Sequence, residues 1–433
     1  MTINKLHWFL RARKRAATLV SILALVVALA SVFLATHSIC AADRAEGRES
    51  YVLSHLGGIA PPGTFTTLYS FRGTPDGIHP LASLIRDKEG NFYGTTRGGG
   101  AFNVGTVFEL MADNTEIILY SFMGRPDGKQ PAEGLARDAA GNLHGITHFG
   151  GSSNRGTVFE LTANGVETVL HSFTGGADGG SPEDESLIWD GMGNLYGTTA
   201  GGGTQSDGTV FKVDPAGNES VLYSFRGGAD GFSPYSGLVR DTAGNLYGTT
   251  LGGGRYGVGT IYKVNLEGDE TTLYTFTGGA DGAYPVGGVT LDSTGDIYGT
   301  ADSGGDASCF APYGCGTVFK LDTSGNFTAL HIFTGGADGI EPLAGVTLDA
   351  MGNIYGTTAH GGSGPCNLSS GAPDCGIIFR VDNAGVETVL YNFSRPGGVF
   401  PSSVLIPDSD GNLYGTTREG GDANYGTVFR FTP

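Results

Sequence analysis

Short runs rich in β-branched and aromatic residues recur along most of the chain, separated by clusters of Gly, Pro, Asn and Asp. This pattern is typical of strands joined by tight turns. One representative unit predicts strand A over 237–241, strand B over 245–250, strand C over 259–264 and strand D over 270–276. The predicted unit is a four-stranded antiparallel meander.

The unit repeats at nearly constant spacing. The Leu of a Leu-Tyr-Ser-Phe-like segment stands at Leu68, Leu119, Leu170, Leu222, Leu273, Leu330 and Leu390, with steps of 51, 51, 52, 51, 57 and 60 residues. Seven units of about 50 residues with four strands each match the blades of a β-propeller. The sequence therefore predicts an all-β fold, a seven-bladed β-propeller.

The order of the predicted strands indicates how the ring closes. The first strand (66–71) is of type D and the last (426–431) is of type C, so the final unit lacks its own rim strand. We expect the N-terminal strand to complete the last blade, because closure removes open sheet edges. In this arrangement the two Gly-rich loops, such as 276–285 (D to A) and 199–203 (B to C), lie on one face.

The N-terminal residues predict export. Basic side chains (Lys5, Arg11, Arg13, Lys14 and Arg15) precede an apolar run over 16–35, and small residues precede a cleavage site expected after Ala42. The run is also long enough to be retained as a membrane anchor, which is the alternative. We therefore predict a signal peptide or anchor over 1–42, a polar linker over 43–63 and the propeller over 64–433.

Charge excludes one class of partner. The formal net charge of −18 becomes −23 on removal of residues 1–42, which contain five basic and no acidic side chains. An acidic surface repels nucleic-acid backbones and anionic lipid heads. We expect no nucleic-acid partner, and a membrane only if the N-terminal segment is retained.

Four cysteines bracket the two insertions that lengthen the last steps. Cys309 and Cys315 enclose one, and Cys366 and Cys375 enclose the other, each just before a strand C. Exported proteins keep disulfides, whereas a metal site is disfavoured because no Cys-x-x-Cys or paired His lies nearby. We predict the bonds Cys309–Cys315 and Cys366–Cys375.

The repeat resembles a known family. Leu222-Tyr223-Ser224-Phe225, the Gly227 to Gly231 loop, the segment from Asp241 to Thr250 and Gly259-Thr260 are similar to the Gloeobacter/Verrucomicrobia tandem repeat of exported bacterial "choice-of-anchor" proteins. The resemblance covers residues 64 to 433 and implies an exported or surface-displayed protein, without an established activity. Members often end in an anchoring tail. The chain stops two residues after Phe431, so we expect anchoring only through the N-terminal segment.

An Asp-Gly pair marks the D-to-A loop of six units, at Asp76, Asp127, Asp178, Asp230, Asp281 and Asp338. The favoured interpretation is that Asp accepts hydrogen bonds from its own loop while Gly adopts a positive φ. Ca²⁺ binding is the alternative, although each loop offers one carboxylate and Ca²⁺ takes roughly six to eight oxygens. We expect no cofactor.

Function is expected where one unit departs from the others, since repeated residues serve the fold. Units two and three depart most, and His79 precedes strand A of unit one. The candidate ligand-binding residues are His79, Glu133, His148, Asp184, Glu185 and Trp189. The sequence favours an exported binding or scaffold protein that recognises an extracellular glycan or protein on the Gly-rich face. The alternative is a propeller glycoside hydrolase or polysaccharide lyase that uses acids at the channel mouth as acid and base.

Overall fold

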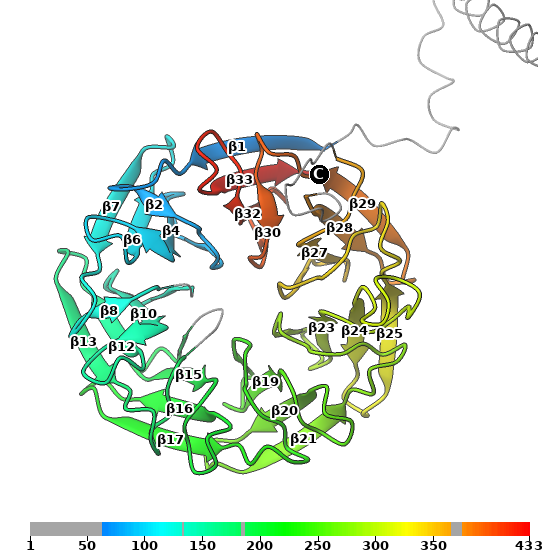
Figure 1. Ribbon diagram of the computed structural model, residues 1–433, viewed down its shortest axis with the longest axis horizontal. Helices are drawn as coiled ribbons and strands as arrows, with labels where there is room; N and C mark the ends of the chain where they lie inside the picture. The colour runs from blue at the N-terminus through cyan, green and yellow to red at the C-terminus, as the bar shows by residue number, and fades with distance from the viewer. Residues whose placement is uncertain (1–62, 132–133, 183–186, 365–374) are drawn as a thin grey trace, which may run out of the picture. The chain divides into compact units, whose positions relative to one another are not determined.

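Each repeat forms four antiparallel strands, and the seven blades lie in a ring around a central opening (Figure 1). The computed structural model describes residues 63–131, 134–182, 187–364 and 375–433. Within these ranges every regular element is a strand, and no helix capable of crossing a membrane is found. The predicted seven-bladed β-propeller is confirmed. The leader and most of the linker predicted before residue 63 lie outside the described residues.

The strands of each blade follow one another from the channel outward in the order A, B, C, D. Blade 1 contains β3 (Ile85–Arg86), β4 (Phe92–Thr96), β6 (Thr106–Leu110) and β7 (Glu116–Ser121); blade 2 contains β9 (Ala136–Arg137), β10 (Leu143–Thr147), β12 (Thr157–Leu161) and β13 (Glu167–Ser172). Blade 3 contains β14 (Ile188–Trp189), β15 (Leu195–Thr199), β16 (Thr209–Val213) and β17 (Glu219–Ser224); blade 4 contains β18 (Val239–Arg240), β19 (Leu246–Thr250), β20 (Thr260–Val264) and β21 (Glu270–Thr275). Blade 5 contains β22 (Val289–Leu291), β23 (Ile297–Ala301), β24 (Thr317–Leu321) and β25 (Phe327–Ile332); blade 6 contains β26 (Thr347–Leu348), β27 (Ile354–Thr358), β28 (Ile377–Val381) and β29 (Glu387–Asn392). Blade 7 contains β31 (Ile406–Pro407), β32 (Leu413–Glu419), β33 (Thr427–Thr432) and β1 (Thr64–Ser70).

The ring closes as the strand order predicts. Strand β1 pairs antiparallel with β33, from Thr64 opposite Thr432 to Ser70 opposite Thr427. The N-terminal strand thus forms the rim of the last blade (Figure 1). Phe65 secures this closure, because its ring stacks on Tyr391 of blade 6 at 4.1 Å between centroids.

The two Gly-rich loops share a face, as predicted, and they are joined by short ladders. Strand β2 (Gly77–Ile78) of a D-to-A loop pairs with β5 (Gly98–Gly99) of a B-to-C loop, and β8 (Gly128–Lys129) pairs with β11 (Phe149–Gly150). In blade 7, β30 (Val399–Pro401) pairs with β32 in the same way. We call this side of the ring the loop face.

The inner strands are shorter than predicted, at two or three residues. Near the channel, hydrogen bonds from side chains replace part of the backbone ladder between strands A and B. In blade 4, Ser236 Oγ accepts a hydrogen bond from the Thr249 backbone N–H at 3.0 Å. This bond satisfies a buried backbone donor that a longer strand A would have paired.

Aromatic rings pack adjacent blades against each other. The Phe that follows each strand D is fully buried, and its ring meets the strand-C aromatic of the next blade edge-on, as Phe122 meets Phe159 at 5.1 Å. A Gly on strand B leaves room for that strand-C ring: a Cβ on Gly145 would lie 2.6 Å from Phe159. The recurring aromatics therefore serve the fold, as interpreted from the sequence.

The Asp of the D-to-A loop accepts the hydrogen bonds predicted for it, and a second Asp closes the A-to-B turn in a similar way. Asp127 Oδ2 accepts from the backbone N–H of Met123 at 2.8 Å and from the Tyr120 hydroxyl at 3.1 Å. On the opposite face, Asp138 accepts from the backbone N–H and side-chain amide of Asn142. Each carboxylate thus closes its own loop.

The predicted disulfide Cys309–Cys315 is present in the B-to-C loop of blade 5, with a Cα–Cα distance of 5.7 Å. Cys375 is also disulfide-bonded and fully buried. Its predicted partner Cys366 lies outside the described residues, so that pairing stays a prediction.

A Glu at the start of five rim strands faces the loop Asp of the preceding blade; these are Glu116, Glu167, Glu219, Glu270 and Glu387. Burial and then the negative charge of Asp76 raise the pKa of Glu116 to about 7. Burial and Asp127 do the same to the pKa of Glu167. The Oε1 atoms of Glu116 and Glu167 are buried without a hydrogen-bond partner.

Candidate functional site

On the loop face, one backbone position with a positive φ recurs in every blade, shortly before the residues that line the central cavity, and we call this end of the channel the mouth. The residue before the D-to-A loop proline has a positive φ in all seven blades, between 48° and 57°, although none of the seven is Gly. These residues are His79, Gln130, Ser181, Ser233, Tyr284, Glu341 and Phe400. Left-handed backbone is uncommon for such side chains, and its recurrence in every blade shows that the loop geometry of the repeat imposes it.

Backbone hydrogen bonds hold each of these residues in place. Its N–H donates to a carbonyl in the B-to-C loop of the preceding blade, as His79 N donates to Tyr425 O at 2.9 Å. In six blades its carbonyl accepts from the residue after strand B, as His79 O accepts from Arg97 N at 3.1 Å. Each blade therefore presents two side chains whose identity varies along the ring: the residue before the loop proline, and the residue that follows strand B or, in blade 7, Arg418 within the longer β32. We call them the mouth positions.

Basic side chains occupy the mouth positions of blades 7, 1 and 2. The set consists of Arg418, His79, Arg97 and His148, and we call it the basic arc. Burial lowers the pKa of His79, and the charges of Arg418 and Arg97 lower it further against the opposing effect of Glu419. Burial and Arg97 likewise lower the pKa of His148, which is partly offset by a bond to the Pro182 carbonyl. Arg97 and Arg418 are exposed.

Acidic side chains occupy the mouth positions of blades 5 and 6. Burial and then the charge of Glu341 raise the pKa of Asp302 to about 6, and Asp302 Oδ1 is buried without a hydrogen-bond partner. Burial also raises the pKa of Glu341, whose Oε2 lies 3.3 Å from His360 Nε2. The Glu341 N–H donates to the carbonyl of disulfide-bonded Cys315, so the disulfide loop supports this pair.

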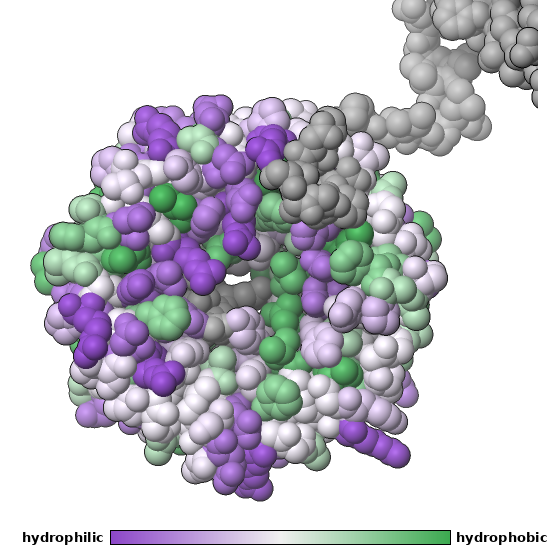
Figure 2. All heavy atoms as spheres, viewed as in Figure 1, coloured by the Kyte–Doolittle hydropathy of each residue, from purple (hydrophilic) through white to green (hydrophobic). Residues whose placement is uncertain are grey.

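The mouth thus carries basic side chains in blades 7, 1 and 2 and acidic side chains in blades 5 and 6, whereas the channel below it is apolar. A cavity of about 260 Å³ at the ring centre is lined by Gly, Ser, Thr, Leu, Ile and Val residues of strand A and the segment before it. No charged side chain is among the described residues that line it. Figure 2 shows hydrophilic residues gathered beside the central opening where blades 7, 1 and 2 lie in Figure 1. The charged side chains of the mouth positions therefore lie outside the lining of this cavity.

Exposed aromatic side chains also gather on the loop face. In the described part of the chain, every exposed Phe or Tyr lies in a D-to-A or B-to-C loop; they are Phe102, Tyr235, Tyr256, Tyr284, Phe310, Tyr313 and Tyr425. The exposed apolar side chains of the opposite face are aliphatic or Met, such as Met192 and Met351. Folding alone does not require aromatic rings in water, so their segregation distinguishes the loop face from the opposite face.

The structure places three of the six predicted ligand-binding residues. His79 and His148 both lie at mouth positions, and Arg97 acts electrostatically on each of them. Trp189 ends β14 at the A-to-B turn, away from the loop face, and packs against the core cluster of Phe211 and Leu195. Glu133, Asp184 and Glu185 lie outside the described residues. The ligand-binding role of all six stays a prediction.

Sequence reasoning missed Arg97, Arg418, Asp302 and Glu341. The signal that could have found them is the column of residues before each loop proline and the column after each strand B. Both columns vary in charge between otherwise similar units. Runs of acids and the rare His residues stand out in the sequence. In these columns, by contrast, one unit differs from the next by a single substitution, which is easily overlooked.

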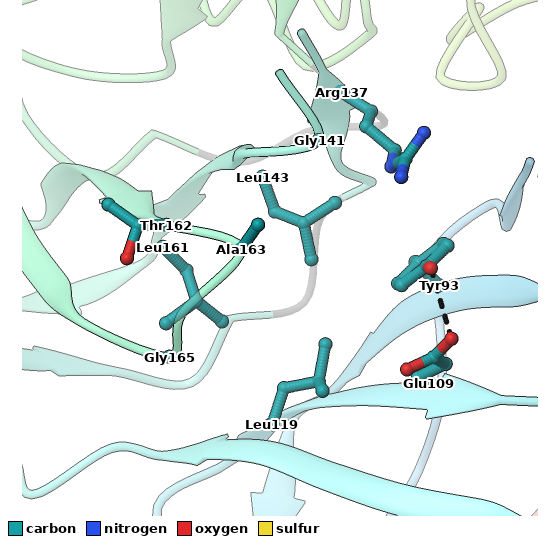
Figure 3. Close-up of a pocket in the computed structure, with 10 residues that line it drawn as sticks. All are labelled: Tyr93, Glu109, Leu119, Arg137, Gly141, Leu143, Leu161, Thr162, Ala163 and Gly165. Carbon is teal, nitrogen blue, oxygen red and sulfur yellow. Dashed lines mark hydrogen bonds between the residues drawn. The ribbon is translucent and has the colours of Figure 1, made fainter. Parts of the chain in front are cut away.

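A smaller pocket of about 120 Å³ lies between blades 1 and 2, toward the opposite face. The Arg137 guanidinium lies 5.3 Å from the centre of the Tyr93 ring, and the Tyr93 hydroxyl donates to Glu109 at 3.0 Å (Figure 3). Arg86 packs in the same way on Tyr414 at the junction of blades 7 and 1. This recurrence is explained by packing between blades.

In the part of the chain that the structure describes, no group of three or more His, Cys, Asp or Glu side chains is arranged to hold a metal ion. The fold and the mouth together define a seven-bladed β-propeller with a polarised entrance. The sequence matches the Gloeobacter/Verrucomicrobia repeat over residues 56–191 and 184–365. The chain belongs to this repeat family. No curated protein matches the sequence.

Solved structures share the fold at low identity. The extracellular domain of a one-component system from B. thetaiotaomicron is 9% identical with a TM-score of 0.53, over 85% of this chain and 40% of that one. The extracellular domain of a hybrid two-component system from the same organism is 15% identical with a TM-score of 0.51, over 86% and 41%. This chain therefore spans about two fifths of their length. A fungal alcohol oxidase of the AA5 family, in complex with copper, is 14% identical with a TM-score of 0.54, over 86% and 77%.

Proposed function

We propose that the protein is an exported binding propeller that recognises an extracellular glycan on its loop face. The observation that carries the proposal is the segregation of exposed Phe and Tyr to the D-to-A and B-to-C loops. A pyranose ring offers an apolar face of C–H groups and a border of hydroxyls. An exposed aromatic ring stacks on the first while polar loop groups hydrogen-bond the second.

Two features support export. The N-terminal residues predict a secretion signal, and the chain contains the disulfide Cys309–Cys315 and a second bonded cysteine, Cys375. Disulfides persist in oxidising compartments and are rare in the cytosol. The disulfide also closes the loop that carries the exposed Phe310 and Tyr313.

A glycan array with the purified protein tests the proposal, followed by affinity measurements on any bound glycan. The double variant Phe310→Ala and Tyr313→Ala should weaken binding about tenfold, because two aromatic contacts contribute roughly 0.5–1.5 kcal/mol each beyond area burial. The matched control, Met192→Ala with Met351→Ala, removes exposed apolar side chains from the opposite face and should leave affinity unchanged. An array without any bound glycan would contradict the proposal and favour a protein ligand.

A second candidate function is hydrolysis or elimination on an extracellular glycan. It is favoured by the acidic mouth pair, because the raised pKa of Asp302, about 6, suits a proton donor near neutral pH. Asp302→Asn should then abolish turnover of a bound glycan and retain its binding. Turnover that persists in this variant, or its absence from the wild-type protein, would exclude this role for Asp302.

A further inference from the structure

The basic arc is the feature of the mouth that the fold leaves unexplained. Its four members come from two different columns of the repeat and from three blades, and the same columns carry Ser, Leu, Ala or Tyr elsewhere in the ring. Packing between blades therefore does not demand a cation at these positions. Burial is the main cause of the lowered pKa of His79, and the charges of Arg418 and Arg97 lower it further, which places the two guanidinium groups near this imidazole.

The two arginines are placed to meet an anion from outside. Both are exposed, and Arg97 makes no ion pair with an acid of the described residues. Arg418 Nε lies 3.9 Å from Glu419 Oε1. Backbone hydrogen bonds from Arg97 N to His79 O, and from His148 N to Gln130 O, hold the backbone of three members of the arc. An anion bound here would relieve the mutual repulsion of the arc.

We propose that the basic arc of His79, Arg97, His148 and Arg418 binds the carboxylate of an acidic saccharide, so that the glycan recognised on the loop face contains uronic acid. This inference rests on the proposed glycan-binding function. A guanidinium matches a planar carboxylate with two parallel hydrogen bonds. The exposed Tyr425, whose carbonyl binds His79 N, lies next to the arc and offers an aromatic ring to the attached sugar.

The net negative charge of the protein limits the length and the charge of the anionic ligand that the arc can bind. Charges beyond a Debye length of about 8 Å are largely screened at physiological ionic strength. A single carboxylate in the arc therefore responds mainly to the local basic groups. A long polyanion would instead extend over the acidic remainder of the loop face, including Asp302 and Glu341. We expect short uronate segments to bind and highly sulfated chains to bind poorly.

The test compares three saccharides of equal length by titration calorimetry. They are tetragalacturonate, its fully methyl-esterified form, and a sulfated neutral tetrasaccharide. Wild-type protein should bind tetragalacturonate at least tenfold more tightly than the ester, because a hydrogen bond to a charged group contributes roughly 1.5–3 kcal/mol. Arg97→Gln and Arg418→Gln should each weaken binding of the acid at least tenfold and leave the weak binding of the ester unchanged.

Arg226→Gln is the matched control, because Arg226 is an exposed arginine on the loop face in blade 4, outside the arc. It should retain wild-type affinity, and unchanged melting temperatures in all three variants would show that the fold is intact. Equal binding of acid and ester, or no loss in Arg97→Gln, would overturn the carboxylate inference while glycan binding stands. A preference for the sulfated sugar would also overturn it. Absence of binding to every saccharide, on an array as well, would overturn both proposals.

Discussion

The rim carboxyl pairs should make the propeller less stable as the pH rises through neutrality. Glu116 and Glu167 have pKa values of about 7 in the folded protein, raised from 4.5. A carboxyl whose pKa is raised by folding contributes stability that is fully present below its unfolded pKa and lost as the pH rises through the folded value. The stability that these two carboxyls contribute is therefore lost between about pH 4.5 and pH 7 as the pH increases.

The size of the effect follows from the shift and the burial. A rise of roughly 2.5 pKa units corresponds to about 3.4 kcal/mol for a fully desolvated group. Both side chains are only half-buried, so solvent screening reduces this to about 1 kcal/mol each. Two pairs then give about 2 kcal/mol between pH 5 and pH 8. For a domain of this length that is roughly 3 °C in melting temperature, if the ring unfolds cooperatively.

The assay is denaturant unfolding of the wild type and of the double variant Glu116→Gln, Glu167→Gln at pH 5, 6, 7 and 8. The Gln side chains imitate the protonated carboxyls, so the variant should gain about 2 kcal/mol on the wild type between pH 5 and pH 8. Glu89→Gln with Glu267→Gln removes two exposed acids and controls for net charge. A wild-type profile with the same slope as the Gln variant would refute the reasoning, because the pairs would then be ionised and solvated.

Three further predictions concern stability. The double variant Cys309→Ser, Cys315→Ser should lose about 2 kcal/mol in urea unfolding, the chain-entropy value for so short a loop, and reduction of the wild type should approach the same value. Phe65→Ala should cost about 3 kcal/mol by the same assay and expose the β1–β33 junction to proteolysis, since Phe65 contacts Tyr391, Phe393 and Phe429. Gly150→Ala should cost at least about 2 kcal/mol in thermal unfolding, because φ is 97° and the new Cβ would lie 2.2 Å from the Asp127 carbonyl oxygen; Gly165→Ala, with φ 80° and open space, should cost about 1 kcal/mol.

Residues that build the fold were predictable because each must recur in every unit. The Phe after strand D and the Asp of each loop perform one packing or hydrogen-bonding task seven times, so their spacing reveals them. The residues that we propose to be functional at the mouth occur in one or two units, so no regular spacing marks them. His79 and His148 stand out because His is rare in this chain, whereas Arg97 and Glu341 resemble ordinary surface charge in the sequence.

The sequence by itself determined the number of blades, the antiparallel meander, the closure through β1 and the face that carries the Gly-rich loops. The spacing of the repeats and the order of their strands can be followed along the chain itself. A ring whose first strand is of type D and whose last is of type C can then close only if these two strands share a blade. Only the tertiary structure decided which side chains meet at the mouth. Arg418 and His79 are more than three hundred residues apart, and their proximity exists because the last blade closes against the first. The charge that each residue experiences, and hence its chemistry, depends on that closure.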